Sequence, residues 1–155
     1  MGKILVVEDD NDIRDMLGET LGMWQYEHEP AKHGKEGLEI FSKGGISLIL
    51  TDMRMPVMDG LTMLKKIRQM DKTVPIIVIT GYPSLNSAME SLSCGADFYL
   101  VKPINITDLK IKIEKCFQKT GMVRTIARLE KSNKILIWLL AAGFAAGFAA
   151  GALFM

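Results

Sequence analysis

The sequence predicts an α/β domain with a doubly wound, five-stranded parallel sheet, followed by a C-terminal transmembrane helix. Short apolar runs recur along the chain, and segments with apolar residues three and four positions apart separate them. Residues 135–155 carry no charged side chain, which predicts the membrane span. The 155 residues therefore divide into a domain at 1–120, a basic juxtamembrane linker helix at 121–134 and a transmembrane tail anchor at 135–155.

The first half of the domain alternates strand and helix. The first strand is the apolar run 4–7, and the spacing of apolar residues over 13–21 predicts the helix that follows it. A weaker strand at 25–29 is expected to stop at Pro30, and the same helical spacing returns at 35–41.

The second half repeats the alternation three times. Proline, aspartate and glycine at 56–60 indicate a turn between a strand and the next helix. Gly95 is expected to close a helix, because glycine is favoured just past helix ends. The remaining elements are expected, in order, as a strand at 48–51, a helix at 61–67, a strand at 76–79, a helix at 84–93, a strand at 98–101 and a helix at 106–117.

Polar residues stand where four of these strands end. Glu8 and Asp9 follow the first strand, Asp52 the third, Thr80 the fourth and Lys102 the fifth. Parallel strands end at one edge of the sheet, so these side chains are expected to converge there. Clustered carboxylates repel one another unless a cation joins them, and an all-oxygen set suits Mg²⁺. A carboxylate beside Mg²⁺ can attack phosphorus and become an aspartyl phosphate, stabilised by the lysine and the hydroxyl.

On these residues the chain resembles the response-regulator receiver family of two-component signalling, a flavodoxin-like fold. The resemblance covers about residues 2–120. Each matching segment is weak alone, but together they stand in order at the ends of successive strands. The segments are 4–9, 50–60, 79–81 and 99–103.

The resemblance implies a role for each residue at this edge. Asp52 is expected to accept the phosphoryl group from a histidine kinase or a phosphotransfer protein. The other implied roles are Mg²⁺ binding by Glu8, Asp9, Asp52 and the backbone carbonyl of Arg54, phosphoryl contacts by Thr80 and Lys102, a switch formed by Thr80 and Tyr99, and a cis bond before Pro103.

Two positions depart from the commonest family pattern. Glu8 replaces the usual first aspartate and is expected to hold the metal through water, and Gly81 follows the switch threonine where alanine is common. By the same resemblance, Arg54 and Tyr82 flank the phosphoryl site and tune its lifetime, in a direction that the sequence leaves open.

The segment Asp10-Asn11-Asp12 is also similar to the Asp-x-Asp motif of haloacid-dehalogenase-type phosphatases. That motif continues to threonine or valine two residues on, where this chain has Arg14, and it would leave Asp52 unexplained. We expect Asp10 and Asp12 to act as capping acids at the start of a helix.

The uncharged tail is long enough to span a bilayer as a helix, about 31 Å against a hydrocarbon core of about 30 Å. Arg124, Arg128, Lys131 and Lys134 precede it, and no charge follows. The positive-inside rule therefore predicts a single-pass protein of the cytoplasmic membrane with its receiver domain in the cytoplasm.

A four-residue repeat inside the tail places Gly143, Gly147 and Gly151 on one stripe of the helix. Such a stripe lets a second helix approach closely, which favours a homodimer through the tail. The alternative is low-complexity sequence that faces lipid.

The net charge of +1 averages a domain of net −2 (15 basic, 17 acidic residues in 1–120) and a remainder of net +3 (4 basic, 1 acidic in 121–155). Neither value suits nucleic-acid binding through bulk electrostatics, so no nucleic-acid partner is expected. Cys94 and Cys116 are expected as reduced thiols, and they form no zinc-ligand pattern with the two histidines.

The sequence thus predicts a membrane-anchored, single-domain response regulator that signals through changed protein–protein contacts. We expect no catalysis beyond self-phosphorylation and autodephosphorylation. The alternative is a membrane-tethered scaffold or localisation adaptor in which phosphorylation is incidental. The intact set of Glu8, Asp9, Asp52, Thr80 and Lys102 favours the switch, because a scaffold has no physical need for it.

Overall fold

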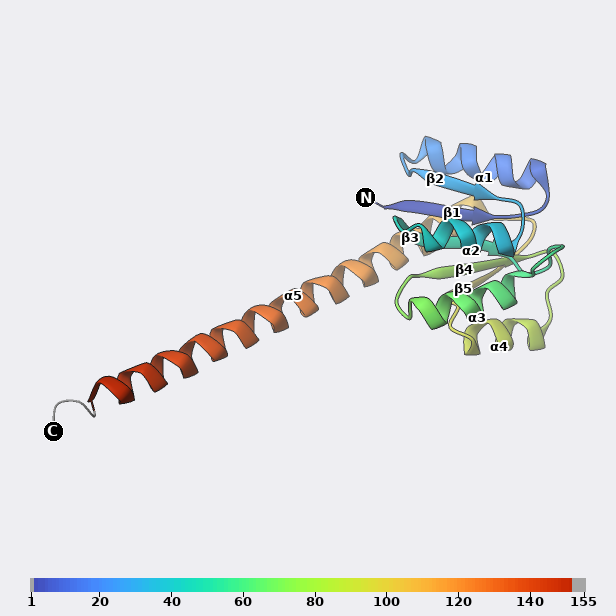
Figure 1. Ribbon diagram of the computed structural model, residues 1–155. Helices are drawn as coiled ribbons and strands as arrows, with labels where there is room; N and C mark the ends of the chain where they lie inside the picture. The colour runs from blue at the N-terminus through green and yellow to red at the C-terminus, as the bar shows by residue number, and fades with distance from the viewer. Residues whose placement is uncertain (1, 152–155) are drawn as a thin grey trace. The chain divides into compact units, whose positions relative to one another are not determined.

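A computed structural model describes residues 2–151; within the last helix, the side chains of residues 123, 124, 126, 127 and 136–151 lie outside the description. Strands and helices alternate along the described chain (Figure 1). The elements are β1 (Lys3–Val7), α1 (Asn11–Met23), β2 (His28–Ala31), α2 (Gly34–Ser42), β3 (Ile46–Asp52), α3 (Gly60–Met70), β4 (Ile76–Thr80), α4 (Leu85–Ser93), β5 (Phe98–Val101) and α5 (Ile106–Gly151).

The five strands form one parallel sheet in the order β2-β1-β3-β4-β5. The chain moves outward in one direction through β2 and in the other through β3, β4 and β5. The strand order therefore reverses beside β1, and ligands of open α/β sheets bind at such a switch point. The predicted doubly wound, flavodoxin-like sheet is confirmed.

Helices cover both faces of the sheet, which is why its strands are continuous apolar runs (Figure 1). Ile4 and Val6 of β1 face a core that includes Leu109 of α5. Leu5 and Val7 face the opposite core, which includes Leu64 of α3. Adjacent residues of a strand thus pack into the cores on opposite faces of the sheet. The polar residues that follow the strands are held at the edge where the strands end.

The second strand differs from the sequence-based prediction. It begins at His28 and includes Pro30, which pairs with Val6, instead of running from 25 to 29. Gln25 has a φ of +63°, so the chain turns there before the strand begins. Proline is tolerated because β2 lies at the edge of the sheet, where an amide that donates no hydrogen bond costs little.

The chain divides into two units, Met1–Gln118 and Lys119–Met155. Helix α5 extends to Gly151, so Gly121 lies inside a helix and does not break it. Across the part of the chain that the structure describes, no helix is both long and apolar enough to cross a membrane. Apart from Ile135, the predicted span at 135–155, with its stripe of Gly143, Gly147 and Gly151, falls outside the residues whose side chains are described.

Candidate functional site

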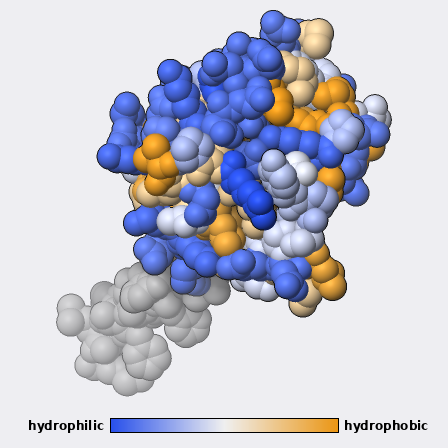
Figure 2. Space-filling model, turned by 90° about the vertical axis from the view of Figure 1, so that its right-hand side faces the viewer, coloured by the Kyte–Doolittle hydropathy of each residue, from blue (hydrophilic) through white to orange (hydrophobic). Residues whose placement is uncertain are grey.

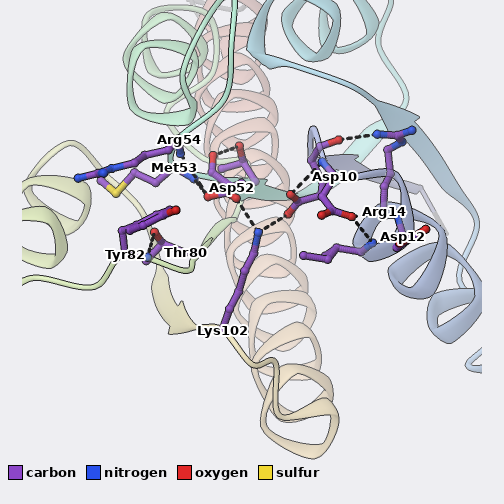
Figure 3. Close-up of polar contacts among 12 residues, drawn as sticks. Asp10, Asp12, Arg14, Asp52, Met53, Arg54, Thr80, Tyr82 and Lys102 are labelled. Carbon is purple, nitrogen blue, oxygen red and sulfur yellow. Dashed lines mark hydrogen bonds and ion pairs between the residues drawn. The ribbon is translucent and has the colours of Figure 1, made fainter.

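The carboxyl ends of the strands bring together polar residues from distant parts of the chain. Figure 2 looks onto this edge, where hydrophilic side chains cover much of the face. Glu8 follows β1, Asp52 ends β3, Thr80 ends β4 and Lys102 follows β5. Asp52, Thr80 and Lys102 lie close together in Figure 3, and Glu8 lies 2.9 Å from Lys102. The predicted convergence is therefore present in the structure.

Three carboxylates form the acidic part of this edge. One carboxylate oxygen from each of Glu8, Asp9 and Asp52 lies within 4.8 Å of the others. Glu8 and Asp52 are buried, whereas Asp9 is exposed. An all-oxygen set with one open side fits Mg²⁺, which binds few protein carboxylates and keeps several waters. The residues present therefore fit the Mg²⁺ that the sequence predicts at this edge.

Lys102 supplies the positive charge that opposes these acids. Its Nζ lies 2.6 Å from Oδ2 of Asp52 and 2.9 Å from Oε2 of Glu8. Burial lowers the pKa of Lys102, but the hydrogen bonds to Asp52 and Glu8 outweigh that effect and raise the pKa above its ordinary value. Lys102 therefore stays an ammonium and can hold negative oxygens at this edge.

Glu8 is the most deeply buried of the three acids, with 2% of its surface exposed. Burial raises the pKa of Glu8 above its ordinary value; the hydrogen bond from Lys102 opposes the rise, and the charge of Asp52 adds to it. The site thus contains more negative charge than Lys102 alone neutralises, which favours binding of a further cation.

Backbone groups fix the carboxylate of Asp52, which is 8% exposed. The amides of Met53 and Arg54 both donate hydrogen bonds to Oδ1, so Oδ2 is the oxygen turned toward Lys102 (Figure 3). The loop closes tightly behind Asp52, because a Cβ on Gly60 would lie 1.9 Å from the Asp52 carbonyl oxygen. A glycine is therefore required where α3 begins.

Thr80 and Tyr99, which the resemblance assigns to a switch, lie on the neighbouring strands β4 and β5. Thr80 is fully buried, and its Oγ1 accepts a hydrogen bond from the amide of Tyr82 at 3.2 Å. Tyr99 is half-buried, and its hydroxyl lies 2.9 Å from Oγ of Ser87, in the first turn of α4. Ser87 also completes a capping box with Ser84, so the hydroxyl of Tyr99 is linked to the start of α4. Sequence patterns gave no signal for this contact.

Other residues at this edge also have defined positions. The Arg54 guanidinium stacks over the exposed ring of Tyr82, 4.8 Å from its centroid (Figure 3). The peptide bond between Lys102 and Pro103 is cis, as the resemblance implies. Asp10 caps α1 through hydrogen bonds from the amides of Asp12 and Ile13, so its predicted capping role is confirmed. Asp12 lies in the first turn of α1.

Arg14 is a residue of this edge whose role sequence reasoning missed. It is 9% exposed, and its guanidinium donates to the carbonyl oxygen of Glu8 at 2.7 Å. This contact could not be predicted from the residue pattern, because an arginine near the start of a helix is ordinarily a solvent-exposed residue.

Residues 4–114 match the response regulator receiver domain. The chain belongs to the response regulator receiver family. Sporulation initiation phosphotransferase F of Bacillus subtilis is 34% identical over 113 residues, which cover 73% of this chain and 91% of that protein. As a member of this family, the chain contains a receiver domain of the kind phosphorylated on aspartate in two-component signalling, by histidine kinases or phosphotransfer proteins.

Solved receiver structures agree with the family assignment. A CheY-like receiver domain protein from Methanospirillum hungatei is 36% identical with a TM-score of 0.74, covering 79% of this chain and 98% of that one. The chemotaxis protein CheY4 of Vibrio cholerae is 35% identical with a TM-score of 0.71, covering 75% and 98%.

Some relatives are much longer. The regulatory protein AtoC of Escherichia coli is 31% identical over 132 residues, which cover 85% of this chain but only 29% of that protein. The similarity to such regulators therefore concerns their receiver part.

Proposed function

We propose that this chain is a membrane-anchored, single-domain response regulator in which Asp52 accepts a phosphoryl group from a histidine kinase or phosphotransfer protein. The observation that carries the proposal is the setting of Asp52. Its Oδ1 is held by two backbone amides, its Oδ2 lies 2.6 Å from the Lys102 ammonium, and two further carboxylates stand beside it.

The chemistry follows from these positions. An oxygen of the Asp52 carboxylate forms a bond to phosphorus while the bond from phosphorus to the donor nitrogen breaks, and the electron pair stays with that nitrogen. Glu8, Asp9, Asp52 and the carbonyl of Arg54 would hold Mg²⁺, which would supply positive charge opposite the phosphoryl oxygens when bound. Lys102 Nζ moves its contact from the carboxylate to the new phosphoryl group. The chain acts as a phosphoacceptor, not as an enzyme with a separate substrate.

The signal leaves through contacts made near α4 and β5. The Thr80 hydroxyl turns toward the phosphoryl group, and Tyr99 moves inward behind Thr80. This movement breaks the contact between the Tyr99 hydroxyl and Ser87 at the start of α4. Leu85 and Met89 of α4 are 76% and 59% exposed, which supports a protein partner at this surface.

Membrane anchoring rests on sequence. Residues 135–155 are uncharged, and the basic residues before them place the receiver on the cytoplasmic side of the membrane. Gly143, Gly147 and Gly151 bring two tails together in the bilayer.

Phosphorylation is tested with the full chain, acetyl phosphate and Mg²⁺. Intact-mass measurement is expected to show one added phosphoryl group, and the Asp52→Asn variant is expected to show none. An equal mass gain in Asp52→Asn would reject Asp52 as the acceptor. If beryllofluoride with Mg²⁺ leaves the Tyr99 resonances unchanged, the scaffold alternative is favoured over the switch.

Anchoring is tested by extracting membranes that contain the full chain with alkaline carbonate. We expect the chain to stay in the membrane pellet, and its release into the soluble fraction would contradict the anchor. In a bilayer association assay, Gly147→Ile is expected to weaken self-association, whereas unchanged association would reject the dimer.

A further inference from the structure

Arg14 of α1 is a buried cation whose hydrogen-bond acceptors are both neutral oxygens. Its Nη1 donates to the carbonyl oxygen of Glu8 at 2.7 Å, and its Nη2 donates to Oδ1 of Asn11. Among the described residues, no carboxylate lies within ion-pair distance of its guanidinium. A charge this deeply buried is costly unless its hydrogen bonds are well made, so these two neutral oxygens are what holds it there.

The loop that Arg14 contacts carries two of the three acids of the site. It consists of residues 8–10 alone, between β1 and α1. Other bonds tie its two ends: the Glu8 amide donates to the carbonyl of Ala31 at 3.0 Å, and the Asp10 carbonyl accepts from the Arg14 amide at 3.0 Å. The peptide between Glu8 and Asp9 is the part that the guanidinium holds.

Holding that carbonyl fixes more than one atom. A peptide unit is planar, so the direction of the Glu8 carbonyl sets the positions of the Asp9 nitrogen and Cα. Asp9 is exposed, and among the described residues no side chain forms a hydrogen bond or ion pair with its carboxylate. Its backbone is therefore the part of Asp9 that the protein controls.

We propose that Arg14 is a positioning residue for divalent-cation binding. It holds the Glu8–Asp9 peptide so that the Glu8 and Asp9 carboxylates reach the cation in a fixed arrangement with Asp52. The inference rests on the proposed Mg²⁺ site and deepens it. Groups that orient metal ligands change metal affinity by about 10- to 100-fold when they are removed.

The test is calorimetric titration of the full chain with Mg²⁺ alone, free of any phosphoryl donor. Arg14→Met removes both donated hydrogen bonds and is expected to weaken Mg²⁺ binding by about tenfold or more. Arg14→Lys keeps the charge but cannot bond both oxygens in the same way, so an intermediate affinity is expected.

Arg68→Lys is the matched control, because Arg68 is also largely buried and donates to the carbonyl oxygens of Gly95 and Asp71. It lies at the amino ends of the strands, so its substitution is expected to leave the Mg²⁺ dissociation constant within about twofold, the scatter of uncoupled sites.

Unchanged Mg²⁺ affinity in a folded Arg14→Met or Arg14→Lys protein would overturn the proposal. An equal loss in Arg68→Lys would also overturn it, because the effect would then come from general destabilisation. If Arg14→Met does not fold, the Mg²⁺ affinities of Arg14→Lys and Arg68→Lys are compared instead, and a weaker affinity in Arg14→Lys alone supports the proposal. If the unsubstituted chain binds no Mg²⁺, the metal site itself fails, which is a separate result.

Discussion

The two ends of the sheet bury similar groups and use them differently. At the carboxyl ends of the strands, Lys102 pairs with Glu8 and Asp52, with Asp9 nearby. At the amino ends, Arg68 of α3 lies 3.5 Å from Asp97, which directly precedes β5. Each end therefore joins a cation from one element to acids from another.

At the amino ends of the strands, the side chains of Arg68 and Asp97 form hydrogen bonds to backbone groups of neighbouring loops and strands. The Arg68 guanidinium donates twice to the Gly95 carbonyl, at 2.7 and 3.1 Å, and once to the Asp71 carbonyl at 3.2 Å. The Asp97 carboxylate accepts from the amide of Ile76 at 3.0 Å. Burial lowers the pKa of Arg68 even though Asp97 and Asp71 oppose the change, but an arginine stays charged throughout.

The difference lies in charge balance and in the kind of partner. Arg68 bonds to carbonyl oxygens that stay where the backbone puts them, so this end fixes loops. Lys102 bonds to side-chain carboxylates that outnumber it, so its contacts can be exchanged for those of an incoming anion. Burial of a cation beside acids is thus compatible with a structural clamp or a reactive site, and the partners decide which.

The comparison is tested most strongly by Arg68→Met. Losing three hydrogen bonds to carbonyl oxygens and the ion pair with Asp97 is expected to lower the free energy of unfolding by about 3 kcal/mol. Urea unfolding measures the loss, and phosphorylation of the folded fraction by acetyl phosphate is expected to persist. Loss of phosphorylation in folded protein would show that the two ends are coupled.

Mg²⁺ is expected to stabilise the chain through the carboxyl end alone. At a free Mg²⁺ concentration tenfold above its dissociation constant, the free energy of unfolding should rise by about 1.4 kcal/mol. Removing Mg²⁺ with a chelator should reverse the gain, and Asp9→Asn should diminish it. A gain of the same size in Asp9→Asn would place the stabilising ion elsewhere.

Gly95→Ala is expected to loosen the amino end. Gly95 has a φ of +102°, and a Cβ there would lie 2.8 Å from Nε of Arg68. We expect a loss of about 1–2 kcal/mol in unfolding free energy, measured by urea unfolding, with Mg²⁺ affinity unchanged. Gly44→Ala is the control, since Gly44 also has a positive φ, +83°, but a Cβ there meets nothing within 4 Å; a similar loss in both would remove Arg68 from the explanation.

The smallest expected effect is a gain in stability caused by a substitution. Without Mg²⁺, Asp9→Asn removes one of three neighbouring carboxylates and is expected to raise the free energy of unfolding by roughly 0.5 kcal/mol, because Asp9 is exposed and its repulsion is screened. Urea unfolding in a chelator measures this change. A decrease in stability would show that the acids are not mutually repulsive in the folded chain.

Local patterns predicted most of the domain. The strands are buried on both faces, so their apolar runs stood out, and the predicted convergence of Glu8, Asp9, Asp52, Thr80 and Lys102 followed from where parallel strands end. Strand β2 was predicted wrongly, because an edge position, which the sequence does not reveal, is what permits Pro30.

Contacts made by long side chains were not predictable in the same way. Arg14 reaches the Glu8 carbonyl, Arg68 reaches Gly95, and Tyr99 reaches Ser87. Each contact depends on how loops and helices pack against the sheet, and the spacing of apolar residues in the sequence does not predict that packing.

The sequence by itself determined the alternation of strands and helices and the residue types at the strand ends, because hydrophobic spacing and chain order are local properties. Only the tertiary structure decided that Lys102 holds Asp52 and Glu8 together, while Arg68 is bound to carbonyl oxygens at the other end. The physical reason is that a buried cation takes its role from the oxygens within its reach, and folding alone sets which oxygens those are.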